Sequence, residues 1–125
     1  MVLVDTSVWI RFLAGHAPYL DELARLLGLR EVAGHDLVYG ELLIGDKGGR
    51  PKLLAMYERM HQSSVVPHAE VVAFVRDRGL NGRGVSWTDV HVLASALAGR
   101  MQLWTADASL ATLAREFHVA YKPKP

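Results

Sequence analysis

The residues of this chain best suited to chemistry are four acids at the ends of apolar segments or inside them. They are Asp5, Glu41, Asp89 and Asp107. Clustered carboxylates repel one another and persist where a cation lies among them. A ligand set made only of oxygens, with no cysteine and no implied histidine, suits a hard cation such as Mg²⁺ or Mn²⁺. Such an ion lowers the pKa of a bound water and stabilises charge developing on phosphate, so these acids indicate metal-assisted phosphodiester hydrolysis.

Each acid also has an ordinary structural explanation. Asp5 directly follows the apolar run 2–4 and can end a strand and cap a helix. Asp89, in the first turn of an apolar helical segment, can complement the helix dipole, and Asp107 can serve as a turn or N-cap residue. Glu41 is costly to bury on an apolar helix without a partner, unless it points outward. All four converge if the first and fourth strands are neighbours where the strand order reverses.

Short apolar runs alternate with helical periodicities along the chain. The strand candidates lie at 2–4, 31–33, 101–105 and 119–121, with a very short apolar run at 65–66. Helical patterns cover 8–13, 20–27, 37–44, 51–60, 71–75, 90–98 and 110–117, and Asp36 is a candidate cap for the third of these. This alternation predicts βαβ units, hence an α/β fold: a three-layer α/β/α domain with a mostly parallel central sheet of about five strands.

Length and composition favour one intracellular domain. The chain has 125 residues, of which 50% are hydrophobic and 22% charged, an ordinary globular composition. The absence of cysteine excludes disulfides, thiolate metal sites and cysteine nucleophiles. No apolar run approaches the roughly 18 residues of a membrane span, and the N-terminus lacks the basic region of a signal peptide. We expect a single domain over 1–125 with a flexible tail at 122–125, located in the cytoplasm without membrane contact.

The charge balance suits a polyanionic substrate handled through a cation. The formal net charge is +1, but setting the four candidate acids aside leaves nine acids against 14 Lys and Arg, or +5. The basic residues that could contact phosphates, or could equally be solvated loop charges, are Arg11, Lys47, Arg50, Lys52 and Arg83. The alternative is that the net charge of +1 is that of an ordinary near-neutral protein and indicates no particular partner.

Three tryptophans and six histidines also invite functional interpretations. Trp9, Trp87 and Trp104 stand beside acidic positions and could stack on bases, although their apolar surroundings favour core packing. The histidines are scattered, with no pair at the i, i+4 spacing of a helical metal site. We therefore interpret them as surface or core residues.

Four blocks of sequence surround the four acids. They are VLVDTSVWI (2–10), VYGELLIG (38–45), GVSWTDVHVLA (84–94) and LWTADASL (103–110). In order, spacing and total length they resemble the blocks of PIN-domain ribonucleases, above all the VapC-type toxins of bacterial toxin–antitoxin pairs, and the resemblance covers residues 1–121. It implies a PIN-like domain and a metal-dependent endoribonuclease that cleaves structured RNA. It also implies a homodimer and inhibition by a cognate antitoxin whose tail occupies the active groove.

The resemblance assigns roles to individual residues. It makes Asp5 and Asp89 the main ligands of Mg²⁺ or Mn²⁺, with Asp107 completing the cluster and Glu41 holding the ion or its waters, in part through water. These four acids are the expected catalytic residues. Three hydroxyls match the polar neighbours of the family's acids and are expected to hydrogen-bond and orient them: Thr6, Ser7 and Thr105.

Other functional classes fit the residues less well. A phosphoacceptor signalling domain needs adjacent acids after the first strand, where Thr6 follows Asp5, and an acceptor aspartate near 67–69, which has none. A phosphatase with an aspartyl nucleophile needs a second aspartate where Ser7 stands. Two alternatives stay open: a housekeeping PIN-type RNA-processing nuclease, and an RNA- or partner-binding module with a vestigial site. The short chain without appended domains favours the toxin.

Overall fold

A computed structural model of the chain describes residues 1–123, so residues 124–125 of the predicted tail lie outside the described part. The strands are β1 (Val2–Val4), β2 (Val32–Gly34), β3 (His61–Gln62) and β4 (Gln102–Trp104). The helices are α1 (Thr6–Leu13), α2 (Tyr19–Gly28), α3 (Asp36–Gly45), α4 (Pro51–Arg59), α5 (His68–Arg78), α6 (Trp87–Ala98) and α7 (Ala108–Glu116). Helices thus alternate with short strands, as the periodicity predicts.

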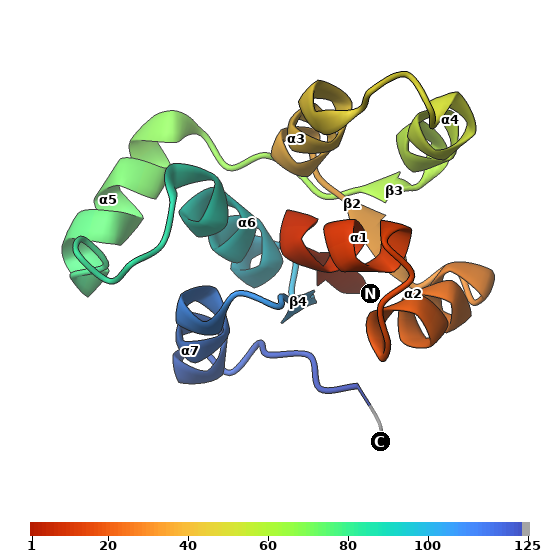
Figure 1. Ribbon diagram of the computed structural model, residues 1–125. Helices are drawn as coiled ribbons and strands as arrows, with labels where there is room; N and C mark the ends of the chain where they lie inside the picture. The colour runs from red at the N-terminus through yellow and green to blue at the C-terminus, as the bar shows by residue number, and fades with distance from the viewer. Residues whose placement is uncertain (124–125) are drawn as a thin grey trace.

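The four strands form one parallel sheet in the order β3-β2-β1-β4. β1 is buried along its whole length, as its continuous apolar run predicts, and it lies between β2 and β4. The chain therefore reverses its direction across the sheet when it passes from β3 to β4. Figure 1 shows helices on both sides of the sheet, with α4 beside β3 at one end and α7 beside β4 at the other. This is the predicted α/β/α arrangement.

The sheet has four strands among the described residues, fewer than the expected five or so. The segment predicted as a strand at 119–121 contributes one isolated parallel bridge, between Ala120 and Leu103. His118 has a positive φ of 60° immediately before it, and Pro123, which lacks an N–H donor, follows closely. Little extended chain is therefore left to pair. The third strand lies at His61–Gln62 and not at the apolar pair 65–66, which runs directly into a proline.

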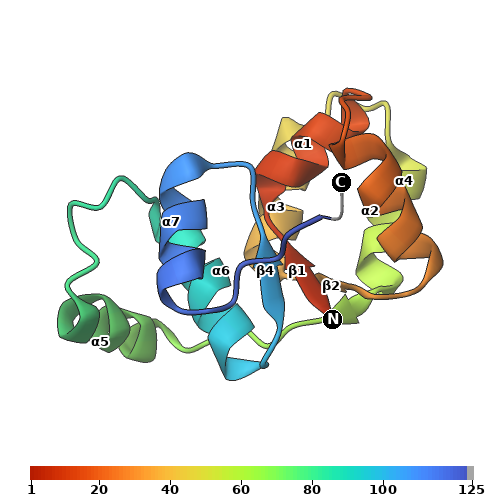
Figure 2. The same cartoon turned by 90° about the horizontal axis from the view of Figure 1, so that it is seen from below.

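Helix α6 passes through the interior beside β4, and residues 90–96 are all buried. Figure 2 shows α6 and α7 together next to β4, with α5 farther out. Helix α6 packs against β4 and leads into it through residues 99–101, so the helix runs back along the strand and its N-terminus lies at the edge of the sheet where β4 ends. None of the helices described over residues 1–123 is long and apolar enough to span a membrane.

A buried histidine joins three helices and corrects one local prediction. Asp36 is the first residue of α3, and its N-cap is His35, whose Nδ1 accepts a hydrogen bond from the Leu37 N–H at 3.0 Å. Nδ1 is therefore unprotonated, so Nε2–H donates to Ser95 Oγ on α6 at 3.0 Å. The His35 N–H donates to the Tyr57 hydroxyl of α4 at 2.8 Å. This network sets where α3, which carries Glu41, sits against α6, which carries Asp89.

Candidate active site

Asp5 lies at the centre of the candidate site, directly after β1. Its backbone N–H continues the ladder by donating to the Trp104 carbonyl of β4 at 2.9 Å. Its side chain is 3% exposed, and Oδ2 accepts two hydrogen bonds, from Ser7 Oγ at 2.7 Å and from Thr105 Oγ1 at 2.9 Å. A buried carboxylate is tolerated when donors satisfy it. Both hydroxyls bind the same oxygen, so neither holds Oδ1.

The two hydroxyls are themselves held by backbone donors from the β4–α7 loop. Ser7 Oγ accepts from the Ala106 N–H at 2.9 Å, and Thr105 Oγ1 accepts from the Asp107 N–H at 3.0 Å. Each hydroxyl oxygen accepts a hydrogen bond from a backbone N–H, and each hydroxyl proton is then donated to Asp5. Residues about 100 positions apart in the chain thus orient one carboxylate.

Asp107 and Asp89 both cap helices that begin at this edge of the sheet. Asp107 is the N-cap of α7, and its Oδ1 accepts from the Leu110 N–H at 2.9 Å. Asp89 closes a capping box at the start of α6: its Oδ2 accepts from the Ser86 N–H at 2.9 Å while Ser86 Oγ accepts from the Asp89 N–H. The structural explanation of each acid is therefore correct. It does not displace the functional one, since each cap hydrogen bond uses one oxygen of the carboxylate.

The negative charges of Asp5 and Asp107 act on the carboxylate of Asp89. Burial raises the pKa of Asp89, its hydrogen bond from the Ser86 N–H lowers it, and the negative charges of Asp5 and Asp107 raise it further. Half-buried Asp89 thus lies close enough to both aspartates for their charges to repel its own. Asp5 and Asp107 follow β1 and β4, which pair with each other, so the three aspartates lie in the same region of the molecule.

Glu41 reaches the same region from α3. It is exposed, and its Oε1 accepts from Thr6 Oγ1 at 2.6 Å, which ties α3 to the first residue of α1. Thr6, Ser7 and Thr105 therefore all bond to candidate acids, as the resemblance implies. Because Thr6 directly follows Asp5 in the chain, this hydrogen bond holds Glu41 near Asp5.

The donors of this site fit a hard divalent cation. They are all oxygens, and within residues 1–123 the ion pairs are Arg25–Glu22 and Arg83–Glu116, neither of which involves a candidate acid. No three acids or histidines in that range stand close enough together to hold one ion. Asp89 and Asp107 each use one carboxylate oxygen in a helix cap. Their other oxygens, with those of Asp5, are of the type that Mg²⁺ or Mn²⁺ prefers, and binding one ion would require the carboxylates to draw closer together.

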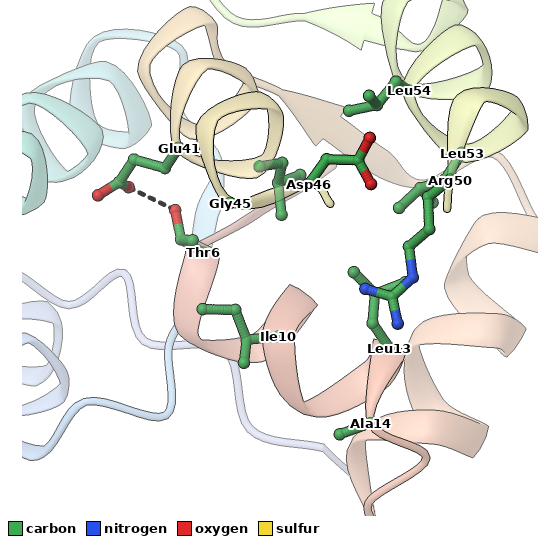
Figure 3. A pocket seen from close by; sticks show the side chains of 11 residues that line it. Thr6, Ile10, Leu13, Ala14, Glu41, Gly45, Asp46, Arg50, Leu53 and Leu54 are labelled. Atoms are coloured by element: carbon green, nitrogen blue, oxygen red, sulfur yellow. Dashed lines mark hydrogen bonds between the residues drawn. The ribbon is translucent and has the colours of Figure 1, made fainter. Parts of the chain in front are cut away.

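An apolar groove opens beside Glu41 and Thr6 (Figure 3). Its volume is about 390 Å³, and it lies between α1, α3 and α4. The apolar side chains along it are Ile10, Leu13, Leu42, Leu53 and Leu54. Asp46 and Arg50 stand at the end away from Glu41. The groove therefore starts at two residues of the candidate site, Thr6 and Glu41, and continues as a largely apolar surface.

The basic residues considered for RNA contact fall into different environments. Arg83 pairs with Glu116 at 2.8 Å, and Arg11 donates to the Ser7 carbonyl at 3.0 Å while its guanidinium lies over the Tyr19 ring. Arg50 lines the groove, and Lys47 and Lys52 are exposed on the same loop and helix start. The structure thus gives Arg83 and Arg11 internal partners.

Two features of the site region differ from what the sequence indicates. The apolar surroundings of Trp87 favour core packing over base stacking, as for Trp9 and Trp104, yet Trp87 is 44% exposed while they are 0% and 3% exposed. Its place at the first position of a helix was the available signal, since one side of such a residue lacks a preceding turn. The structural role of His35 was also missed, because its partners come from distant segments.

Comparison with known proteins agrees with this fold. Residues 2–116 match the PIN domain family, so the chain belongs to the PIN-domain family. Two curated relatives are the Ribonuclease VapC32 proteins of Mycobacterium tuberculosis strains CDC 1551 / Oshkosh and ATCC 25618 / H37Rv. Each is 41% identical over 121 residues, which is 96% of this chain and 95% of the relative. These matches place the chain among VapC-type PIN proteins.

A solved structure shares the fold. The crystal structure of PAE2754 from Pyrobaculum aerophilum superimposes with a TM-score of 0.59 and 19% sequence identity. The match covers 89% of this chain and 82% of that chain. At this identity the likeness concerns the arrangement of strands and helices.

Proposed function

We propose that the chain is a metal-dependent endoribonuclease of VapC type, the toxin of a toxin–antitoxin pair. The observation that carries the proposal is that Asp5 and Asp107 follow two paired strands, β1 and β4, with Asp89 near enough for both charges to act on it. The relatives named ribonuclease over 96% of this chain support RNA as the substrate. We assign the activity to a single domain over 1–125, of which 2–116 match the family.

The chain's own residues supply the acids and the hydroxyl groups that orient two of them. Asp5, Asp89 and Asp107 would hold Mg²⁺ or Mn²⁺ directly, and Glu41 would hold the ion or its waters. When bound, the ion acidifies a water and offsets charge on the phosphate. Ser7 and Thr105 keep Asp5 in one orientation, which reduces the reorganisation needed on binding. Thr6 does the same for Glu41.

Metal should control both activity and stability. We expect Mn²⁺ or Mg²⁺ to start RNA cleavage by the purified protein and EDTA to stop it. Because the acids gather only in the native state, an ion present at 100 times its Kd should also stabilise the fold by about 2.7 kcal/mol. Gel analysis of transfer and ribosomal RNA measures the first effect, and thermal melting measures the second. No cleavage with either ion, together with no shift in Tm, would favour a binding module with a vestigial site.

The hydroxyls around Asp5 give a finer test of positioning. Thr105→Val removes the donor to Asp5 Oδ2 and the acceptor of the Asp107 N–H, so we expect activity to fall about 10- to 100-fold. Thr105→Ser keeps the hydroxyl and should restore most of it. Thr112→Val is the matched control, because the Thr112 hydroxyl bonds to the Ala108 carbonyl on the outside of α7. Loss of activity in Thr105→Ser with full activity in Thr105→Val would mean that the methyl group matters and the hydrogen bond does not.

The groove beside Glu41 is our proposed binding site for a cognate antitoxin. Its apolar lining suits one face of an amphipathic segment, and its opening at Glu41 and Thr6 lets an occupant block the acids. Family resemblance supports a homodimer as the active form. Action on cellular RNA places the proposed activity in the cytoplasm.

A further inference from the structure

Trp87 is an exposed aromatic residue beside the candidate active site that the proposed chemistry does not use. It is the first residue of α6, two positions before Asp89. Among the described residues, none of the other exposed large hydrophobic side chains is aromatic: Met1, Ile10, Leu20, Leu29, Leu43, Ile44 and Val65. Within residues 1–123, Trp87 is the one aromatic among the exposed large hydrophobic residues, and it lies two positions from Asp89.

Two imidazoles hold the indole of Trp87 in place. His68, the first residue of α5, has its ring centroid 5.3 Å from that of Trp87, with the planes at 56°. His91, one turn farther along α6, packs edge-on at 5.1 Å and is 6% exposed. Its buried Nδ1 has no hydrogen-bond partner among residues 1–123, so that atom does not anchor the ring and packing against Trp87 helps to hold it. The indole is therefore supported from two elements while part of its surface faces solvent.

We propose that Trp87 is a stacking platform for an unpaired nucleobase of the RNA strand; this rests on the proposed ribonuclease function. Every nucleobase has a π-face, so an exposed indole binds bases with little regard to sequence. Proteins that act on structured RNA read its unpaired bases by such stacking. Residues two apart on a helix point in different directions, so the base on Trp87 belongs to a nucleotide flanking the one at Asp89.

Binding of a short single-stranded RNA in EDTA tests the platform without metal-dependent cleavage. Because Trp9 and Trp104 are buried, quenching of tryptophan emission by acrylamide reports mainly on Trp87. We expect the RNA to protect Trp87 from acrylamide, and Trp87→Leu to weaken RNA binding about 5- to 150-fold. Trp87→Phe keeps an aromatic ring and should lose less. Leu29→Ala, at an exposed apolar position after α2, is the matched control and should bind as the unmodified chain does.

A strand without bases separates stacking from other losses. An abasic oligonucleotide of the same length should bind the unmodified chain and Trp87→Leu equally, because the contact being tested is absent from both. Equal binding of normal RNA by these two proteins, with unchanged Tm, would overturn the proposal. If Trp87→Leu has a lowered Tm, the affinities of Trp87→Phe and the unmodified chain for the normal and the abasic strand are compared to test the stacking.

Cleavage in Mn²⁺, measured separately, keeps the two proposals distinguishable. RNA binding that depends on Trp87, without cleavage, would contradict the proposed ribonuclease function and support the stacking role of Trp87. Cleavage together with RNA binding that is unchanged in Trp87→Leu would contradict the stacking role and support the ribonuclease function.

Discussion

Replacing Asp5 by asparagine is expected to lower RNA cleavage about 1000-fold or more without unfolding the protein. The change removes a charge that the proposed site needs to hold a cation, and metal chemistry of this kind supplies several kcal/mol of transition-state stabilisation. The amide oxygen of asparagine can still accept from Ser7 and Thr105, so the local hydrogen bonds survive. Steady-state cleavage of RNA in Mn²⁺ measures the loss, and circular dichroism checks the fold.

The Tm of Asp5→Asn tests whether the aspartates repel one another in the metal-free protein. Removing one of three repelling aspartates should leave the Tm of the metal-free protein equal to or above that of the unmodified chain, and should abolish the rise in Tm with Mn²⁺. Asp77→Asn, which removes an exposed charge from α5, is the control for loss of charge alone. Retained cleavage in Asp5→Asn would show that the site is elsewhere. A lower Tm without metal would show that Asp5 acts mainly as a structural hydrogen-bond acceptor.

His35→Ala is expected to destabilise the protein by about 2–4 kcal/mol. The imidazole is fully buried, caps α3 through the Leu37 N–H and bonds to Ser95 of α6, so the variant loses a cap and leaves a cavity. His35→Asn keeps an N-cap acceptor and should lose less. Urea unfolding at pH 7.5 measures the difference. His16→Ala, at an exposed turn, should change stability by less than about 0.5 kcal/mol.

His35 should also make stability depend on pH. Burial lowers the pKa of His35 below its usual 6.5, Asp36 raises it, and His91 lowers it. The unfolded chain therefore takes up a proton at this residue at a higher pH than the native state does. Stability is accordingly lost as the pH falls below about 6.5. The difference between the unmodified chain and His35→Asn isolates this slope, and a pH-independent difference would contradict the assignment.

The amino-acid sequence by itself determined the helices, three of the strands and the role of two acids at helix starts. The apolar run before Asp5 predicts a buried strand, and β1 is buried throughout. The spacing of apolar residues predicts the helices, and each predicted helix is present within a few positions. Asp107 and Asp89 follow turn signals, and both cap helices. These features are local: strand and helix periods, caps and turns depend on neighbours within a few residues.

Tertiary structure alone decided which distant residues meet. The pairing of β1 with β4, and not the residues themselves, brings Thr105 to Asp5 across 100 positions. Trp87 is exposed although the helical segment that follows it, 90–98, is apolar. Arg83 finds Glu116, and His35 finds Ser95, through the same kind of long-range contact. Periodicity reports which face of an element is apolar, whereas strand order and helix packing determine what covers that face.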